Sequence, residues 1–365
     1  MRGMRLSIIG VVIVFALFSA NTEEKQRGRF TKTIAGYSKQ IHIYVPNSYS
    51  DKNPAGLILG LHGSGGNGAG FLSAWNTGLL DKYGFIMVAP DSVTGAWAMG
   101  GDFEGQKREG EYIKAIIEDM KKNYKIDDEK IYVTGFSAGS AYLMVGIAAL
   151  EHFRAFKIRG AALFSGGITG EMGVNPDKAK ETTIRIYIGT GDTPHLGPAQ
   201  NAADSFKKAG YNCELVKVPG AHNYPLTDHT KVLEWFVQLY EPVKKKREVE
   251  KELQEAEKAL SEKKYKEAIK SYQSAKKKAE KEKELEALLK KAEDGLKAVE
   301  QAGVDALAEA EKLANEGKYS DAYKLLKKVQ DDFKGTDIAK QAKDKENELK
   351  EKEKNKPEEK EESDK

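Results

Sequence analysis

A serine inside a glycine-rich turn is the residue of this sequence best placed to do chemistry. Gly135, Ser137 and Gly139 fit the pattern G-x-S-x-G. Residues 131–133 are β-branched or aromatic and predict a buried strand, and apolar residues from Ala141 onward predict a helix. In a strand–turn–helix context this pattern is typical of a nucleophilic serine held in a strained turn, with glycines where the strand and the helix pass close together. The alternative interpretation is a glycine-rich turn without chemistry.

A serine hydroxyl is a weak nucleophile, so it needs a base that takes its proton and an acid that orients the base. When the nucleophile lies on such a turn, an acid and then a histidine follow along the chain, each after a later strand. Asp192 follows the predicted strand 184–188, and His222 follows the predicted strand 213–218. Either residue alone would equally fit an ordinary loop position, but their order favours a triad with the serine. His229 is the fallback base.

The sequence also offers donors for the negative oxygen that develops when an acyl group is transferred. One predicted donor is the backbone N–H of Ala138, and the other lies in the loop 62–65, which follows an apolar predicted strand. Ser64 is the first choice for this second donor and Gly65 is the alternative. His62 is expected to shape the loop rather than to catalyse. A phosphate-binding loop is a poor alternative because the pattern G-x-x-x-x-G-K-[ST] is absent here.

The remaining pattern predicts the elements that bring these side chains together. Short apolar or β-branched runs alternate with stretches of helical periodicity, which predicts an α/β fold with a mostly parallel, eight-stranded sheet covered by helices. The glycine-rich segment 92–110 is predicted to be a loop. The predicted strands are 30–34, 40–45, 56–61, 85–89, 131–133, 161–164, 184–188 and 213–218, and the predicted helices include 112–124, 199–209 and 230–240.

Four motifs carry a resemblance over about residues 30–240. The run IYVTGFSAGSAYLM, the earlier HGSGGN and the later GTGD and PGAH resemble the α/β-hydrolase superfamily, and within it the secreted esterases related to polyhydroxybutyrate depolymerases and feruloyl esterases. The resemblance implies a secreted serine esterase that cleaves carboxylic esters through an acyl-enzyme. Unlike many of these esterases, the chain has a single cysteine, Cys213, and therefore no internal disulfide.

Two other functions are weighed against a serine esterase. The motifs are also similar to prolyl-oligopeptidase-type hydrolases, which makes a serine peptidase the first alternative. That family usually carries a propeller domain, for which this chain has no room. The second alternative is a non-catalytic module that uses the fold as a binding platform, and the intact order of serine, aspartate and histidine argues against it.

The predicted substrate is a bulky or polymeric ester. Only residues 165–183 separate two predicted strands where this fold often carries a lid, and this length is too short for a cap domain. An open site suits polysaccharide-bound acyl groups, feruloyl esters or polyesters. Trp97 is predicted either to stack on the substrate or to anchor its loop, and His195, on the wrong loop for the base, is predicted to line the site. No histidine or cysteine pair has the spacing of metal ligands, so no metal or other cofactor is expected.

The N-terminus has the pattern of a secretory signal. Arg2 and Arg5 precede the apolar run 6–18, and the small residues Ser19 and Ala20 predict cleavage, so the protein is expected to be secreted or periplasmic. An uncleaved N-terminal anchor facing outside is the alternative, and no membrane span is expected after signal removal. The net charge of +3, without a basic stripe interleaved with aromatic residues, gives no reason to expect a nucleic-acid partner.

After Glu241-Pro242 the composition changes to a charged, helical region. Residues 256–269 and 310–323 share several alanine, glutamate, lysine and tyrosine positions, which resembles tetratricopeptide-type helix pairs joined by longer helices. This region is predicted to be either a protein-interaction or spacer module, or a solvated helical array without a partner. The predicted organisation is a signal peptide at 1–20, a catalytic domain at 21–241, a helical region at 242–345 and a charged, disordered tail at 346–365.

Overall fold

The structure is a computed structural model, and the predicted signal peptide at 1–20 lies outside the part of the chain that it describes. Within the described part, no helix is both long enough and apolar enough to cross a membrane. The described residues are 25–99, 101–170, 173–175 and 181–354.

The chain divides into two compact units, Met1–Phe236 and Val237–Lys365. The sequence places the domain boundary at Glu241-Pro242, whereas this division falls inside the long helix α7 (His229–Ser261). The helix runs through Pro242 without a break, so the change of composition at this point does not end an element. The two units are described separately below.

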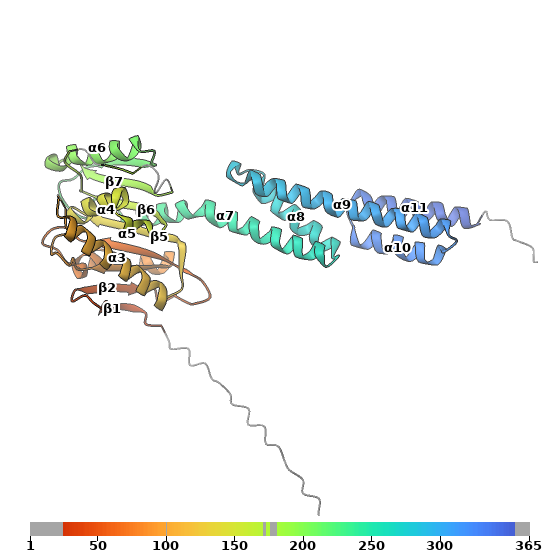
Figure 1. Ribbon diagram of the computed structural model, residues 1–365, viewed down its shortest axis with the longest axis horizontal. Coiled ribbons are helices and arrows are strands. Elements are labelled where there is room, and N and C mark those ends of the chain that lie inside the picture. The colour runs from red at the N-terminus through yellow and green to blue at the C-terminus, as the bar shows by residue number, and fades with distance from the viewer. Residues whose placement is uncertain (1–24, 100, 171–172, 176–180, 355–365) are drawn as a thin grey trace, which may run out of the picture. The chain divides into compact units, whose positions relative to one another are not determined.

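The first unit is built on one eight-stranded sheet, as the sequence predicts (Figure 1). The strands are β1 (Gly28–Thr33), β2 (Gln40–Val45), β3 (Ala55–Leu61), β4 (Phe85–Pro90), β5 (Ile126–Phe136), β6 (Ile158–Phe164), β7 (Thr183–Gly189) and β8 (Cys213–Val218). Their order in the sheet is β1-β2-β4-β3-β5-β6-β7-β8. β2 is antiparallel to both of its neighbours, and all the other pairs are parallel. This is the α/β-hydrolase arrangement, and it brings the carboxyl ends of β3, β5, β7 and β8 to one edge.

The helix α3 (Phe103–Asn123) begins earlier than the sequence analysis predicts. Asp102 caps its first turn, because the side chain accepts a hydrogen bond from the backbone N–H of Gly105 at 2.9 Å. The last part of the segment 92–110 is therefore helical, and the prediction that all of it forms a loop is wrong.

The helix α6 (Thr193–Lys208) also begins before its predicted start at residue 199. Pro194 lies in its first turn, where the missing N–H of a proline costs no helical hydrogen bond. The helix therefore starts directly after Asp192 at the end of β7. The other helices of this unit are α1 (Gly68–Ser73), α2 (Thr77–Tyr83), α4 (Ala138–Ala149) and α5 (Glu151–Arg154).

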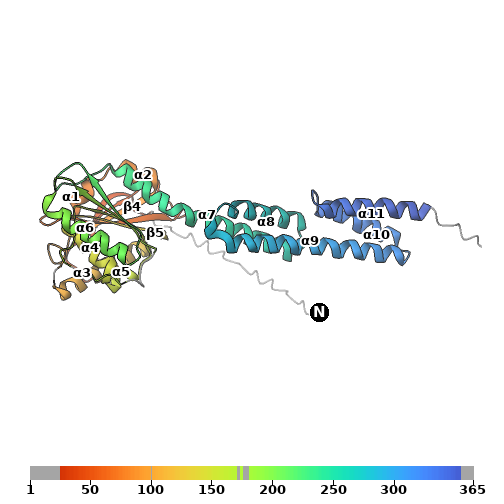
Figure 2. The ribbon, with the colours of Figure 1, turned by 90° about the horizontal axis from the view of Figure 1, so that it is seen from above.

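Helices cover both faces of the sheet because its central strands are apolar on both sides. In β5, Ile131 and Val133 belong to the buried core cluster that also contains residues of α3 and α4. Tyr132 lies between them on the strand, stacks on Phe236 of α7 with ring centroids 4.3 Å apart, and donates a hydrogen bond to the Phe236 carbonyl at 2.8 Å. Figure 2 shows the same division, with α2 and the start of α7 on one side of the sheet and α3, α4 and α5 on the other.

The second unit is entirely helical over its described residues, and the repeat found in the sequence recurs in its backbone. The turn after α7 contains Lys263 with φ 57°, and the turn after α9 contains Gly317 with φ 82°. The next residues, Lys264 and Lys318, each donate a backbone hydrogen bond back across the turn. Likeness to tetratricopeptide repeats stays a prediction. The helices are α8 (Tyr265–Ala279), α9 (Glu286–Asn315), α10 (Tyr319–Asp332) and α11 (Asp337–Lys354), with a short 3₁₀ turn, η1 (Lys283–Leu285).

The last helix continues beyond the predicted start of a disordered tail. Lys345 of α11 pairs with Glu311 of α9 at 2.8 Å, and Leu349 packs against the core of the second unit. These contacts keep residues 346–354 helical, where composition alone predicted disorder. The rest of the predicted tail, 355–365, lies outside the described residues.

Candidate active site

The serine of the G-x-S-x-G motif lies at the sharp turn between β5 and α4. Ser137 has φ 52° and ψ −117°, which is a strained conformation for a residue with a side chain. A Cβ on Gly139 would come within 2.5 Å of the carbonyl oxygens of Leu61 and His62, and one on Gly135 would come within 2.8 Å of the backbone of α4. The close approach of strand and helix that the motif predicts is confirmed.

A second serine, for which the sequence pattern has no signal, fastens this turn to the neighbouring strand β6. The Ser140 hydroxyl is fully buried and lies 2.6 Å from the carbonyl oxygen of Gly135 and 2.9 Å from that of Phe164. It also accepts a hydrogen bond from the backbone N–H of Phe164 at 2.8 Å. The backbone N–H of Ser137 donates to the Phe164 carbonyl at 2.9 Å, so the turn is held to β6 from two sides.

Three side chains predicted to act together form one continuous chain of hydrogen bonds. His222 Nε2 lies 3.0 Å from Ser137 Oγ, and His222 Nδ1 lies 2.8 Å from Asp192 Oδ2. Asp192 follows β7 and His222 follows β8, so both arrive at the edge of the sheet where β5 delivers the serine. With Nδ1 donating to the carboxylate, Nε2 is left as an acceptor for the serine proton.

The carboxylate of Asp192 is enclosed, whereas the imidazole above it is accessible. Asp192 has 1 % of its side chain exposed, and His222 has 35 %. Burial raises the pKa of Asp192, but hydrogen bonds from His222 and from His195 outweigh it and hold the pKa below its ordinary value. Asp192 is therefore ionised at neutral pH, and both of its oxygens can only accept hydrogen bonds.

His195 lies on the other oxygen of the same carboxylate. Its Nδ1 is 2.7 Å from Asp192 Oδ1, and its ring stacks on that of His222 with centroids 4.3 Å apart. His195 sits in the first turn of α6 and not on a separate loop, so its closest polar contact is the acid itself. In the described part of the chain, Asp192, His195 and His222 form a group with ligand atoms within 4.8 Å. Their mutual hydrogen bonds account for this group without a metal ion.

The loop 62–65 passes directly beside the nucleophile. A Cβ on Gly63 would lie 3.2 Å from the Cβ of Ser137. The residues after Gly63 in this loop are exposed, and Gly65 has φ 72°, a left-handed conformation that glycine adopts without strain. This loop therefore lies beside the turn that carries the serine. The roles of the predicted donors stay predictions; they are Ala138, Ser64 and Gly65.

A buried hydrogen-bond network holds the loop 62–65 in place. Trp97 is 2 % exposed, and its Nε1–H donates to the His62 carbonyl at 2.8 Å. His62 Nε2 accepts from the backbone N–H of Ser92 at 3.3 Å, while Nδ1 faces the carbonyl of Gly63 at 2.8 Å, which is the pattern of a neutral imidazole. His62 therefore shapes the loop, as predicted. The burial of Trp97 supports the loop-anchor alternative for this residue and not the stacking one.

At the base of the network lies a carboxylate that the sequence analysis did not single out. Glu109 of α3 is fully buried and accepts hydrogen bonds from Ser92 Oγ at 2.5 Å, Thr94 N at 3.0 Å and Thr94 Oγ1 at 2.8 Å. Ser92 Oγ in turn accepts from the backbone N–H of Trp97 at 3.0 Å. Glu109 thus ties the segment 92–97 to α3 and supports the loop beside the nucleophile through Trp97.

We expect Glu109→Gln to destabilise the protein and to slow catalysis. The donors on Ser92 and Thr94 all bond to Oε1, while Oε2 accepts a hydrogen bond from the backbone N–H of Val93 at 3.3 Å. An amide has one acceptor oxygen, so the donors at one of these two positions lose their partner, at a cost of about 2 kcal/mol. Urea denaturation and kcat/KM for an ester would measure the two effects. Glu104→Gln is the matched control, because Glu104 lies on the same helix and is exposed. Equal stability of the two variants would contradict a role for Glu109 in holding the loop.

The fallback base, His229, takes no part in this chain of hydrogen bonds. It is 6 % exposed, its ring stacks on Trp75 with centroids 3.9 Å apart, and its Nε2 lies 3.2 Å from the hydroxyl of Tyr224. Burial lowers the pKa of His229 to about 4, so the ring is neutral and enclosed among aromatic side chains. The interpretation of His229 as an alternative base is wrong.

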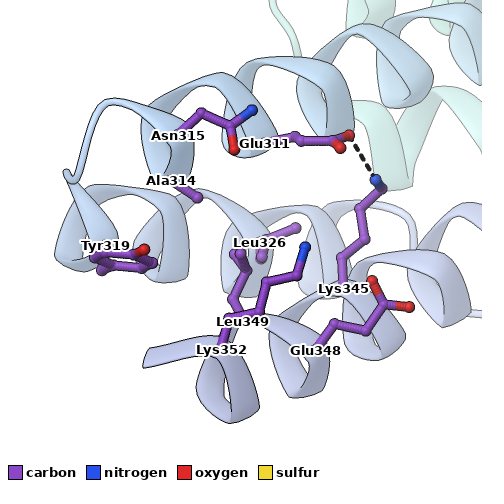
Figure 3. A pocket seen from close by; sticks show the side chains of 9 residues that line it. All are labelled: Glu311, Ala314, Asn315, Tyr319, Leu326, Lys345, Glu348, Leu349 and Lys352. Atoms are coloured by element: carbon purple, nitrogen blue, oxygen red, sulfur yellow. Dashed lines mark hydrogen bonds and ion pairs between the residues drawn. The ribbon is translucent and has the colours of Figure 1, made fainter. Parts of the chain in front are cut away.

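The second unit contains a hollow between α9, α10 and α11 (Figure 3). An ion pair of 2.8 Å between Glu311 and Lys345 crosses it. Acidic and basic side chains are present in equal number, so the hollow has no net charge that would select one class of ligand. The lining residues are Glu311, Ala314, Asn315, Tyr319, Leu326, Lys345, Glu348, Leu349 and Lys352.

Curated proteins similar to this chain carry the names of esterases. The chain is 31 % identical over 163 residues to a bifunctional acetylxylan esterase/xylanase of Neocallimastix patriciarum, covering 38 % of this chain and 23 % of that protein. It is 30 % identical over 135 residues to a poly(3-hydroxyalkanoate) depolymerase of Paucimonas lemoignei, covering 35 % and 31 %. It is 30 % identical over 213 residues to a probable feruloyl esterase C of Aspergillus oryzae, covering 50 % and 75 %.

The extent of these similarities differs among the relatives. The chain spans between 23 % and 47 % of the length of the first three curated relatives it matches, but three quarters of the A. oryzae protein. No sequence-family profile matches the chain. Among solved structures, an S-formylglutathione hydrolase of Staphylococcus aureus has a TM-score of 0.47 at 13 % identity, covering 58 % of this chain and 97 % of that one.

Proposed function

The chain belongs to the same family as feruloyl esterase C, and from this membership we propose that it is a serine hydrolase of carboxylic esters. The observation that carries the proposal is the hydrogen-bonded chain from Ser137 Oγ through His222 to the buried carboxylate of Asp192. A serine on a strained turn, with an imidazole acceptor 3.0 Å away and an ionised acid behind the imidazole, has the parts that acyl transfer requires.

The proposed reaction has two halves. His222 Nε2 takes the proton of Ser137 as the serine oxygen attacks the ester carbonyl, and the developing negative oxygen is held by the N–H of Ala138 and by an N–H of Ser64 or Gly65. The imidazolium, stabilised by the buried carboxylate, then returns the proton to the leaving alkoxide. In the second half the same histidine activates water, which hydrolyses the acyl-enzyme.

The proposed substrate is a bulky or polymeric ester, such as an acetylated or feruloylated polysaccharide or a polyester. The names of the relatives support this class. Large apolar side chains are also exposed in the described part of the first unit, Met99 at 37 % and Phe103 at 77 %. Both follow β4, whose carboxyl end lies at the same edge of the sheet as the serine. Exposed apolar surface of this kind favours contact with a large substrate.

Two substrates that share an acyl group, one an ester and the other an anilide, distinguish an esterase from a peptidase. We expect the full chain to release 4-nitrophenol from an N-blocked Gly-Pro 4-nitrophenyl ester, and no 4-nitroaniline from the corresponding anilide. The acyl group is the same in both compounds, so only the leaving atom decides the result. Cleavage of both at similar rates would favour the prolyl-oligopeptidase-type alternative, and cleavage of neither would leave the binding-module alternative.

The substrate class is tested next. Methyl ferulate, acetylated xylan and amorphous poly(3-hydroxybutyrate) would be compared by the release of ferulate, acetate and hydroxybutyrate. We expect release from at least one of the polymers, because the open site and the exposed apolar side chains suit a long chain. Hydrolysis restricted to small soluble esters would contradict a polymeric substrate.

We further propose that the enzyme acts outside the cytoplasm. The support is the predicted signal peptide at 1–20. For the second unit, a protein partner or a spacer role stays a prediction. The alternative is a solvated helical array, which the mixed charges of the hollow between α9, α10 and α11 fit equally well.

A further inference from the structure

The acid of the triad accepts hydrogen bonds from two imidazoles, and the proposed reaction uses one of them. Asp192 Oδ2 faces His222 Nδ1 at 2.8 Å, and Oδ1 faces His195 Nδ1 at 2.7 Å. An ionised carboxylate has no proton to give, so both Nδ1 atoms must carry the hydrogen. His195 is therefore a donor in a fixed tautomer, with its Nε2 turned away from the acid.

The fold determines the position of this second donor. Asp192 is the residue directly before α6, and His195 follows it by one turn, with Pro194 between them in the first turn of the helix. The backbone N–H groups of His195 and Leu196 donate to the Asp192 carbonyl at 3.0 and 3.1 Å, which fixes the distance between the two side chains.

From this geometry we propose that His195 is a positioning residue that holds Oδ1 of Asp192 and thereby directs Oδ2 toward His222. Without the second donor, the buried carboxylate could rotate about its terminal torsion, because only one of its oxygens would be held by a side chain. The inference rests on the proposed function, since it gives His195 a role in the same reaction without contact with the reacting atoms.

The two imidazoles also contact each other directly. Their rings stack at 4.3 Å and share one carboxylate. Both rings contact the charged Asp192, and Phe136 packs on His222 as an uncharged neighbour. Removal of His195 therefore leaves His222 as the single imidazole donor to this carboxylate.

Two substitutions at position 195 separate the donor from the rest of the side chain. His195→Ala removes the donor, while His195→Asn keeps an N–H donor close to the position of Nδ1 and has no titrating charge. For the full chain with 4-nitrophenyl acetate, we expect His195→Ala to lower kcat about tenfold with an unchanged KM. His195→Asn should restore kcat to within about twofold of the wild-type value.

Several outcomes would overturn the proposal. A His195→Ala protein with the wild-type kcat would reduce His195 to a residue that lines the site. A raised KM with an unchanged kcat would make His195 a substrate contact. An equal loss of kcat in His195→Ala and His195→Asn would show that the N–H donor is not the group responsible for the effect. Labelling with a fluorophosphonate counts the folded sites in each preparation. If the wild-type chain is neither active nor labelled, the proposed function fails together with this inference.

Discussion

Replacing Ser137 by alanine is expected to lower kcat for a carboxylic ester by about 10⁶-fold, the scale of losing a triad nucleophile. The hydroxyl contacts His222 Nε2 at 3.0 Å, and its removal leaves the base without a group to activate. The fold should not suffer, because the backbone hydrogen bond of Ser137 to Phe164 is kept. Steady-state hydrolysis and labelling by a fluorophosphonate would both be measured, and the label should disappear with the activity.

Ser140 is the matched control for this substitution. It lies in the first turn of α4, the helix that follows Ser137, but its hydroxyl joins the carbonyl of Gly135 to the backbone of Phe164. Ser140→Ala should therefore keep the nucleophile and lose about 1–3 kcal/mol of stability, because buried backbone groups lose their partners. If both alanine variants lose activity to the same extent with normal folding, Ser137 is not the nucleophile and the esterase mechanism proposed for it fails.

The strands of the sheet could be predicted because a strand buried on both faces has a continuous run of apolar residues in the sequence. Every residue of β3 and of β4 is buried, so these strands appear in the sequence as unbroken apolar runs ended by glycine or proline. The order of the strands then sets the order of Ser137, Asp192 and His222 along the chain, which is why residues far apart in sequence could be assigned together. Chain order also ranked His222 above His229, and the burial of the His229 ring is in keeping with that ranking.

The contacts that sequence reasoning missed depend on where helices begin. Asp102 and Pro194 are both typical of helix starts. The glycines around Asp102 obscured the first start, and the second was missed because the helical periodicity was recognised only from residue 199 onward. Once α6 is known to start at Thr193, Asp192 and His195 become neighbours at i and i+3. The misplaced helix start is thus the reason why His195 was assigned to the lining of the site and not to the acid.

The burial of Glu109 has no counterpart in the sequence. A glutamate in a charged helix is normally exposed, and its pairing with Ser92 and Thr94 depends on how the segment after β4 folds back onto α3. The same holds for Trp97, which packs against Tyr142 and donates a hydrogen bond to the His62 carbonyl. Patterns of apolar residues predict which elements pack together, but they do not predict which polar groups are enclosed when loops close over them.

Replacing Asp192 by asparagine is expected to lower kcat about 10⁴-fold while the protein stays folded. A neutral amide does not stabilise the imidazolium that forms when His222 takes the serine proton. Its NH₂ group also presents hydrogens to one of two Nδ1 atoms that are both donors in the wild type, so one imidazole must change its tautomer. Stopped-flow measurement of acyl-enzyme formation would locate the loss in the proton-transfer step. A reduction of less than about tenfold would contradict the assignment of Asp192 as the acid.

The pH dependence of stability gives an independent measure of the same carboxylate. Burial and the two imidazole donors together leave the pKa of Asp192 below its ordinary value of 3.8 in the folded protein. The ionised carboxylate therefore contributes stability that is fully present above the ordinary value and is lost as the pH falls through the lowered pKa. Comparing the urea denaturation of wild type and Asp192→Asn between pH 6 and pH 3 should show the difference shrinking at the acid end. A constant difference would mean that the pKa of Asp192 is the same in the folded and unfolded states, which would contradict the lowered pKa.

The combination of Asp192→Asn with His195→Ala decides whether the second imidazole works through the acid. In the wild-type background we expect His195→Ala to lower kcat about tenfold, because the carboxylate loses the donor that orients it. In the asparagine background the same change should lower kcat by less than about twofold, because there is no longer a charged carboxylate to direct toward His222. Two side chains that act on the substrate independently would instead lower kcat by the product of their separate effects. A double variant about 10⁵-fold slower than wild type would therefore show that His195 and Asp192 act independently. A double variant with a kcat close to that of Asp192→Asn would show that His195 acts through the carboxylate 2.7 Å away.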